Sequence, residues 1–413
     1  MMALTDYHNI RWNLKYIAKQ TILRSPYVRH CSQTVYQCLL GCLRFWQATS
    51  SQIWRDRADQ LCHLLQDIQR RDGGFDIGYD FNFGLRHRKG QSTSPELVGL
   101  LALSEYGRLF PIESVLSAAE AATKWIQHFA RPLGQEDWII PYSPYTTSEL
   151  MVYNGISFAV GGLGRYLGCI ANTPDLYQIY HGMVTYMDKV MATDPSLPGR
   201  FWYYNDQSRC DLDETKRRKI DYYHQMQQVE MHSLAHQVCP VSVQQRIIRD
   251  AADHIVALHE RDGVVPYTNS PEFFQGNIHV WGLCSCSSGL LEAAMVIPER
   301  KEMYHRVARE IIDWIIKYSW NGRWFTPVLT PEGKPISNNY MIRSDAWVFN
   351  SLAAGIKHLQ LKQYEDIAEI CFTRMIAAKF SGPETHALSW RVFVLTKIAK
   401  KVMPKKTKIS NVK

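Results

Sequence analysis

An amphipathic helix followed by a glycine turn and an aromatic-rich segment recurs along the chain. In the first copy a helix from Trp54 to Arg71, with leucines at helical spacing, ends at Gly73 and Gly74 just before Phe75. Glycine ends a helix because it adopts positive φ at little cost. The later copies end in Asp137-Trp138-Ile139-Ile140-Pro141-Tyr142, Gly199-Arg200-Phe201-Trp202, Asp262-Gly263-Val264-Val265-Pro266-Tyr267 and Asn321-Gly322-Arg323-Trp324-Phe325. These landmarks lie roughly 60 residues apart, a period that indicates stacked two-helix units.

The pattern predicts six helical hairpins. They pair residues 34–47 with 52–71, 95–110 with 114–129, 149–169 with 175–191, 222–238 with 243–259, 280–295 with 300–318 and 343–359 with 364–380. The first helix of each pair carries small residues such as Gly161, Gly164 and Gly289, whereas the second is charged on one face. Small residues allow helices to approach closely, so we expect the first helices to form an inner ring. The predicted fold is an all-α (α/α)6 toroid with short β segments in the linkers.

The ends of the chain extend beyond these hairpins. We expect an N-terminal helix that packs on the ring in residues 1–33, the toroid in residues 34–403 as the catalytic or binding domain, and a basic disordered tail in residues 404–413. Helices expected at 7–23 and 384–402 can pair into a seventh unit. Closure of the ring with six or with seven hairpins therefore stays open.

Composition narrows the class of partner. The chain of 413 residues has a net charge of +8, part of it in the basic tail, which favours an anionic partner. No recognised nucleic-acid motif and no long basic stripe is found, so we expect no nucleic-acid partner. No run of 18 apolar residues and no signal-peptide core is found, so we expect no transmembrane segment and a cytoplasmic location. The ten cysteines fall mostly in apolar helical stretches and are expected to be reduced; we expect no metal site and no cofactor.

The longest linkers should gather at one end of the ring. Segments 72–93, 131–148, 193–222, 261–279 and 319–342 all lead from a second helix to the next first helix, and the opposite connections are short. Long loops on one face of a rigid scaffold usually carry the binding residues. Aromatic rings there can stack on sugars, while amides and arginines bind hydroxyls and carboxylates. The predicted substrate-binding residues are Arg86, His87, Arg88, Tyr153, Asn154, Trp202, Glu230, His279, Trp281, Asn339, Tyr340 and Trp347.

Candidate catalytic residues lie at two of the helix starts. Removal of the C5 proton of a uronate needs a base, a cation or amide to stabilise the developing enolate, and an acid for the leaving oxygen. These residue types occur together in the segments that begin the fourth and sixth hairpins. The predicted catalytic residues are Tyr222, Tyr223, His224, Arg343 and Asp345.

Other functions fit the same sequence. A glycoside hydrolase needs two carboxylates on one face, and Asp345 can pair with Glu149, Asp221 or Glu230. A non-catalytic toroid that binds glycans or assembles other proteins needs none of these acids. The segment 211–214, Asp-Leu-Asp-Glu, resembles the acidic motif of class II terpene cyclases, but we interpret it as a charged loop because a basic run follows it.

Two short segments resemble known carbohydrate-active proteins. Segments 152–155 (Val-Tyr-Asn-Gly) and 344–350 (Ser-Asp-Ala-Trp-Val-Phe-Asn) resemble inner-helix starts in toroids encoded with bacterial exopolysaccharide synthesis and in the toroidal domains of glucuronyl C5-epimerases and uronate lyases. Over roughly residues 34–400 the chain is similar to these proteins in architecture. It also resembles N-acylglucosamine 2-epimerases in size, without a clear counterpart of their arginine- and tryptophan-rich core signature. The resemblance implies an enzyme of polysaccharide biosynthesis or modification that acts on an anionic, uronate-containing glycan as an epimerase or lyase.

Overall fold

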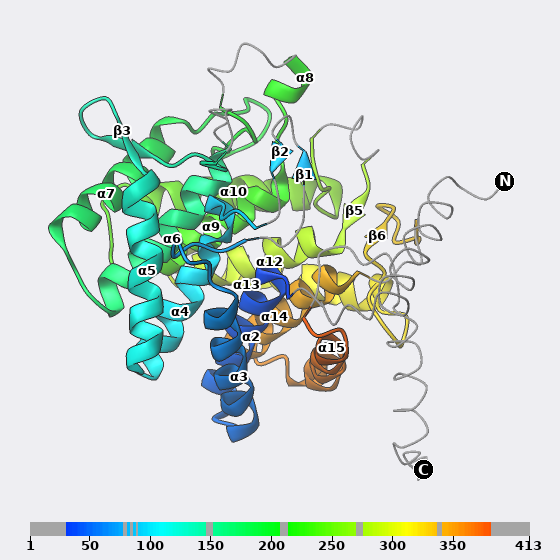
Figure 1. Cartoon of the computed structure of the whole chain (residues 1–413). Helices are drawn as coiled ribbons and strands as arrows, with labels where there is room; N and C mark the ends of the chain where they lie inside the picture. The colour runs from blue at the N-terminus through cyan, green and yellow to red at the C-terminus, as the bar shows by residue number, and fades with distance from the viewer. Residues whose placement is uncertain are drawn as a thin grey trace, which may run out of the picture.

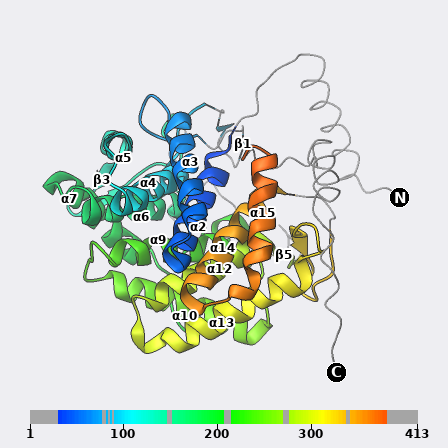
Figure 2. The ribbon, with the colours of Figure 1, turned by 90° about the horizontal axis from the view of Figure 1, so that it is seen from below.

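The structure is a computed structural model that describes residues 30–76, 81–82, 86–87, 90–145, 152–206, 214–269, 276–336 and 341–380. Within these residues six helical hairpins form two concentric rings (Figures 1 and 2). The inner helices are α2 (Ser32–Thr49), α4 (Val98–Leu109, preceded by the 3-10 turn η1, Ser94–Leu97), α6 (Tyr153–Cys169), α9 (Tyr222–His236), α12 (Val280–Ala294) and α14 (Ile342–Leu359). The outer helices are α3 (Gln52–Ile68), α5 (Glu113–Phe129), α7 (Pro174–Lys189), α10 (Gln244–Asp262), α13 (Lys301–Trp314) and α15 (Glu365–Ala377). The predicted all-α (α/α)6 toroid is confirmed.

Short elements fill the connections between the long helices. The helical turns are α8 (Glu214–Arg217), η2 (Pro298–Arg300), the π-turn η3 (Ile315–Ser319) and η4 (Lys362–Tyr364). Within the described ranges, three two-stranded antiparallel sheets pair β1 (Phe81–Asn82) with β2 (Arg86–His87), β3 (Arg131–Leu133) with β4 (Asp137–Ile139), and β5 (Ile278–His279) with β6 (Val328–Leu329). All three sheets lie in linkers from an outer to an inner helix, as the sequence predicted.

The ring closes directly between its first and last hairpins. Each inner helix packs on the next, and α14 packs on α2. The backbone N–H of Cys31 donates to the carbonyl oxygen of Phe380 at 2.9 Å, and Arg57 of α3 makes two hydrogen bonds with Glu369 of α15. Six hairpins are therefore enough to close the ring. The segments 7–23 and 384–402 that we considered as a seventh pair lie outside the described residues.

Glycines set the close spacing of the inner helices. A Cβ atom at Gly164 of α6 would lie 2.3 Å from the Cβ of Ala235 in α9, and one at Gly289 of α12 would lie 2.5 Å from the carbonyl oxygen of Met226. Real Cβ atoms do not tolerate such distances, so these helices meet at their backbones. The prediction that small residues mark the inner ring is confirmed.

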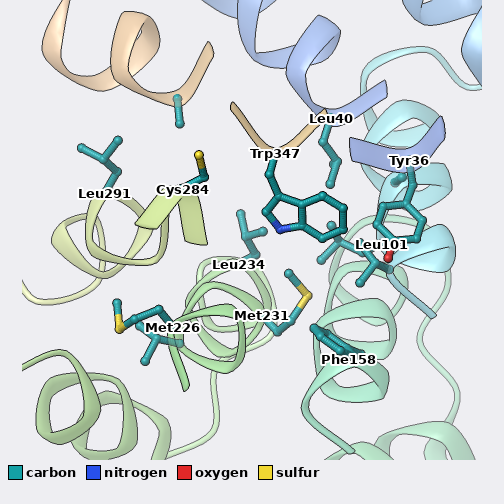
Figure 3. Packing of buried hydrophobic residues seen from close by; sticks show 14 of the residues in the cluster. Tyr36, Leu40, Leu101, Phe158, Met226, Met231, Leu234, Cys284, Leu291 and Trp347 are labelled. Atoms are coloured by element: carbon teal, nitrogen blue, oxygen red, sulfur yellow. The ribbon is translucent and has the colours of Figure 1, made fainter. Parts of the chain in front are cut away.

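The middle of the ring is filled by apolar side chains. Leu40, Leu101, Met231, Leu234 and Trp347 converge from four inner helices and are buried (Figure 3). We call these buried side chains the central plug. The two ends of the ring are therefore separate environments.

Candidate active site

A cavity of about 170 Å³ opens at the end of the ring where the inner helices begin. Its walls come from the first turns of inner helices and from the long linkers beside them, where the sequence predicted a site. The lining residues are Gln33, Tyr36, Pro95, Tyr142, Asn154, Phe158, Tyr204, Lys219, Asp221, Tyr223, His224, Gln227, Tyr267, Arg343 and Trp347. Aromatic rings, amides and charged groups thus meet in one small space.

An acid, a histidine and a lysine form one wall. Asp221 caps α9, and its carboxylate lies 3.0 Å from Nδ1 of His224 and 3.5 Å from Nζ of Lys219. Burial alone would raise the pKa of Asp221, but His224 and Lys219 outweigh it and lower the pKa to about 2. Asp221 therefore stays ionised at neutral pH beside Nδ1 of the imidazole. Nε2, the ring nitrogen that does not face this carboxylate, is the one that can exchange a proton with a ligand.

A cation and a phenol form a second pair. The guanidinium of Arg343 donates to the hydroxyl oxygen of Tyr223 at 3.0 Å and lies 5.2 Å from the ring centre of Trp347. Burial raises the pKa of Tyr223, although Arg343 acts in the opposite direction. Tyr223 is consequently a neutral phenol at neutral pH. Such a pair can bind an anion through the guanidinium and supply a proton through the hydroxyl.

Two amides carry polar atoms with no hydrogen-bond partner among the described residues. Asn154 is only 2% exposed, and neither Oδ1 nor Nδ2 has a partner; Oε1 of the buried Gln33 also has none. Buried polar atoms left without a partner cost about 1–3 kcal/mol each. Because both residues line the cavity, a ligand with hydroxyl groups can satisfy them.

A buried carboxyl group supports Gln33 from behind. Glu96 of η1 accepts a 2.8 Å hydrogen bond from Nε2 of Gln33 and another from the hydroxyl of Ser32. Burial raises the pKa of Glu96 to about 7, against the lowering effect of these hydrogen bonds. The bond from Nε2 fixes the amide of Gln33, so that its oxygen is the group left for a ligand.

The cavity brings together several predicted site residues from distant parts of the sequence. Tyr223, His224 and Arg343 of the predicted catalytic set line it, as do Asn154 and Trp347 of the predicted binding set. His279 and Trp281 lie just behind, since the His279 ring is 4.2 Å from Tyr267 and 4.4 Å from Trp281. Burial lowers the pKa of His279 to about 4, so its imidazole is neutral at neutral pH.

Other predicted residues lie in the core instead. The carboxylate of Asp345 is 0% exposed and pairs with Arg374 of α15 at 2.7 Å, away from the cavity lining. Tyr222 packs near His254, and Tyr153 packs against Tyr186. The indole of Trp202 donates to the carbonyl oxygen of Met187 at 2.8 Å. Each of the four begins an inner helix or lies in a linker, but its side chain contacts an outer helix and does not line the cavity.

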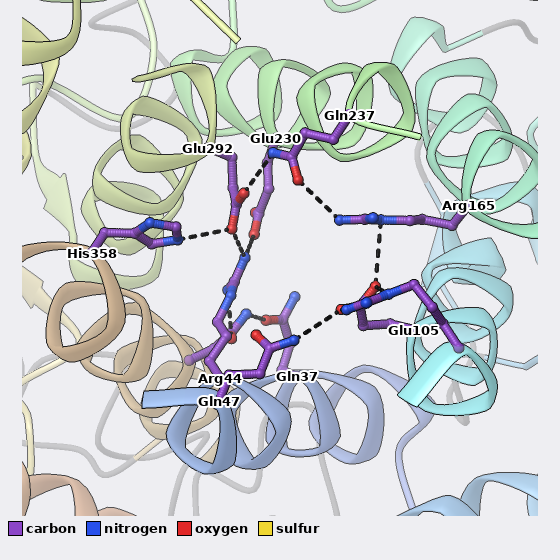
Figure 4. A network of polar contacts seen from close by, with 11 residues as sticks. Gln37, Arg44, Gln47, Glu105, Arg165, Glu230, Gln237, Glu292 and His358 are labelled. Carbon is purple, nitrogen blue, oxygen red and sulfur yellow. Dashed lines mark hydrogen bonds and ion pairs between the residues drawn. The ribbon is translucent and has the colours of Figure 1, made fainter. Parts of the chain in front are cut away.

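Glu230 lies at the opposite end of the ring. Arg44 of α2 donates to Glu230 of α9 at 2.8 Å, to Glu292 of α12 at 2.9 Å and to Asn350 of α14 at 2.6 Å (Figure 4). We call this group the closed-end network. It also includes Gln37, Gln47, Glu105, Arg165, Gln237 and His358 (Figure 4). Glu230 is two turns along its helix, where its carboxylate pairs with Arg44 and does not line the cavity.

The remaining predicted residues are Arg86, His87, Arg88, Asn339 and Tyr340. Arg86 and His87 form strand β2, but their side chains are not described. Arg88, Asn339 and Tyr340 lie outside the described residues. They stay predictions.

Sequence reasoning missed Gln33, Tyr36, Glu96, Phe158 and Gln227. The signal that identifies Gln33 is its position in the helix. Gln33, Asn154, Tyr223 and Arg343 are each the second residue of an inner helix, and all four line the cavity. The predicted first helix begins at Thr34, two residues after the observed start at Ser32, so the prediction does not align Gln33 with the other three.

No helix among the described residues is long and apolar enough to cross a bilayer. No family model and no curated protein matches the sequence. Solved structures with a similar fold include cellobiose 2-epimerase from Spirochaeta thermophila, with 12% identity, a TM-score of 0.59, and 87% of this chain and 99% of that chain covered.

Two other matches carry different activities on the same fold. One is a family 76 glycoside hydrolase (mannosidase) from Bacteroides thetaiotaomicron, with 12% identity, a TM-score of 0.55, and 82% of this chain and 92% of that chain covered. The other is a polysaccharide lyase, with 10% identity, a TM-score of 0.57, and coverage of 86% and 97%. The chain therefore has the α/α-toroid fold that these carbohydrate-active enzymes share.

Proposed function

We propose that the chain is a carbohydrate-modifying enzyme that removes the C5 proton of a uronate residue, as an epimerase or lyase. The observation that carries the proposal is one cavity in which the Asp221–His224 pair, the Arg343–Tyr223 pair and the amide of Asn154 meet. The similar solved structures, which include an epimerase and a polysaccharide lyase, support a carbohydrate substrate by analogy of fold.

Each group has a role in this chemistry. His224, oriented by Asp221, takes the C5 proton at Nε2. The electron pair left on C5 delocalises into the adjacent carboxylate, and Arg343 stabilises the negative charge that develops on its oxygens. Tyr223 donates its phenolic proton in the second half of the reaction. Donation to C5 from the other face gives the epimer, and donation to the oxygen leaving C4 gives the unsaturated product of a lyase.

The hydrolase alternative has less support in the cavity. Of the four acids considered for it, Asp221 lines the cavity, Asp345 and Glu230 are paired elsewhere, and Glu149 lies outside the described residues. A retaining or inverting mechanism needs two carboxylates that flank the scissile bond. A non-catalytic glycan-binding toroid uses the same amides and aromatic rings without turnover.

Incubation with glucuronate-containing oligosaccharides in deuterated water tests these functions together. Deuterium at C5, or an unsaturated product that absorbs in the ultraviolet, supports proton abstraction. New reducing ends without unsaturation support the hydrolase, and binding with no product supports the non-catalytic toroid. His224→Gln should abolish the exchange, whereas His63→Gln on the exposed face of α3 is a control that should not change it.

A further inference from the structure

The cavity is shallow and has a closed floor. On α6 the lining residues are Asn154 and Phe158, and on α14 they are Arg343 and Trp347, in each case the second and sixth residues of the helix. A rise of 1.5 Å per residue makes the depth between these positions about 6 Å. This is roughly the height of one sugar ring standing in the cavity.

The floor is more than one side chain thick. Phe158 and Trp347 line the cavity from below, and Leu40, Leu101 and Leu234 continue the central plug beneath them (Figure 3). These three leucines also line a separate cavity of about 20 Å³ beside the closed-end network. The two cavities share no lining residue, and the buried leucines lie between them, so a ligand enters and leaves at the mouth of the ring.

The walls surround the ligand as well. Lining residues come from α2, η1, α6, α9 and α14. The sixth inner helix, α12, contributes Trp281, whose ring centre lies 5.8 Å from the Arg343 guanidinium. The volume of about 170 Å³ is small beside the roughly 300–1,000 Å³ of typical ligand pockets. An internal residue of a polymer is linked to the chain at two positions, so two chain segments would have to leave the cavity. A terminal residue is linked at one position.

We infer that the cavity accepts a free sugar or the terminal sugar of a chain, and excludes internal residues of a polymer. The inference rests on the proposed function for the identity of the reacting group. Asn154 and Gln33 bind hydroxyls of this one sugar on the neutral wall, while Lys219, Arg343 and His224 face its reacting side. The glycan beyond the terminal residue extends through the mouth toward the linkers.

A length series tests the inference. Glucuronic acid, short oligoglucuronates and a long polyglucuronate are supplied at equal total uronate, and the polymer is also supplied with both ends chemically blocked. The turnover rate should follow the concentration of chain ends, the blocked polymer should be inert, and nuclear magnetic resonance should find deuterium only in terminal residues. Deuterium in internal residues, or equal rates on blocked and unblocked polymer, would overturn the inference.

Binding separates this inference from the proposed chemistry. Calorimetry with His224→Gln should detect the free sugar and the short oligosaccharides but not the blocked polymer, whether or not the wild-type protein turns any of them over. Added to His224→Gln, Asn154→Ala should weaken the binding of the free sugar and of the oligosaccharide by the same factor, about tenfold. If the blocked polymer binds as well as the unblocked one, or if Asn154→Ala weakens only the free sugar, the site extends beyond one terminal residue and the inference is wrong.

Discussion

Arg343 and Tyr223 join two inner helices that are not neighbours in the ring. The 3.0 Å hydrogen bond from the guanidinium to the phenol oxygen links α14 to α9, although α12 lies between these helices. The bond crosses the start of α12 at the mouth of the ring. The two groups that we propose for anion binding and proton donation are thus held by each other as well as by their own helices.

Arg343→Lys tests whether the planar guanidinium of Arg343, and not only its charge, is needed for turnover. Lysine keeps the positive charge but cannot form the same directed bonds to a carboxylate and to Tyr223. We expect kcat to fall by about 10²–10³-fold, the usual effect of removing one donor that stabilises transition-state charge. The measurement is steady-state turnover of a glucuronate oligosaccharide, with Arg306→Lys on the exposed face of α13 as a control. Wild-type turnover in Arg343→Lys would remove Arg343 from the mechanism.

Asp221→Asn tests the ionised partner of His224. The folded-state pKa is lowered from 3.8 to about 2, so this carboxylate stabilises the fold above about pH 4 and loses that contribution as the pH falls toward 2. The shift corresponds to about 2 kcal/mol. At neutral pH, Asp221→Asn should be less stable than the wild type by about this amount, and the difference should vanish near pH 2. Thermal unfolding of both proteins across this range checks it; a difference that does not change with pH would contradict the ion pair.

Glu96→Gln should have the opposite pH dependence. The folded-state pKa is raised from 4.5 to about 7, so the folded protein holds the proton more tightly than the unfolded chain and loses stability as the pH rises through this window. A glutamine does not ionise. The free energy of unfolding of Glu96→Gln should therefore rise by about 3 kcal/mol relative to that of the wild type between pH 4.5 and pH 7. Chemical denaturation at several pH values measures this gain. A constant difference between the two proteins would show that Glu96 is ionised throughout.

Asp345→Ala should destabilise the fold and leave ligand affinity little changed. The substitution leaves Arg374 charged and buried without its carboxylate partner, which typically costs 3–5 kcal/mol. Replacing Arg374 by leucine in the same protein should recover part of the loss, since no lone charge then remains. Glu369→Ala is the matched control, because that partly exposed pair with Arg57 should be worth about 1 kcal/mol or less. Normal stability with lost turnover in Asp345→Ala would instead support a catalytic Asp345.

The sequence was sufficient for the architecture because the architecture repeats. Glycines such as Gly164 and Gly289 identified the inner ring, and the regular spacing identified the pairs. The site depends on side-chain direction, which periodicity near a helix start does not give. Tyr222 and Tyr223 are adjacent in sequence, yet Tyr223 lines the cavity and Tyr222 packs near His254. Asp345 was misleading for the same reason: two residues after Arg343, its side chain points outward to α15.

The contact between Cys31 and Phe380 has a consequence for how the molecule unfolds. Open helical arrays need atypical end repeats to cover their terminal faces, and they can fray from those ends. Here the first and last hairpins cover each other, so every hairpin has two neighbours and none is a natural starting point for fraying. Removing any one hairpin breaks two interfaces at once. The ring is therefore expected to melt as a single cooperative unit, whichever hairpin is weakened.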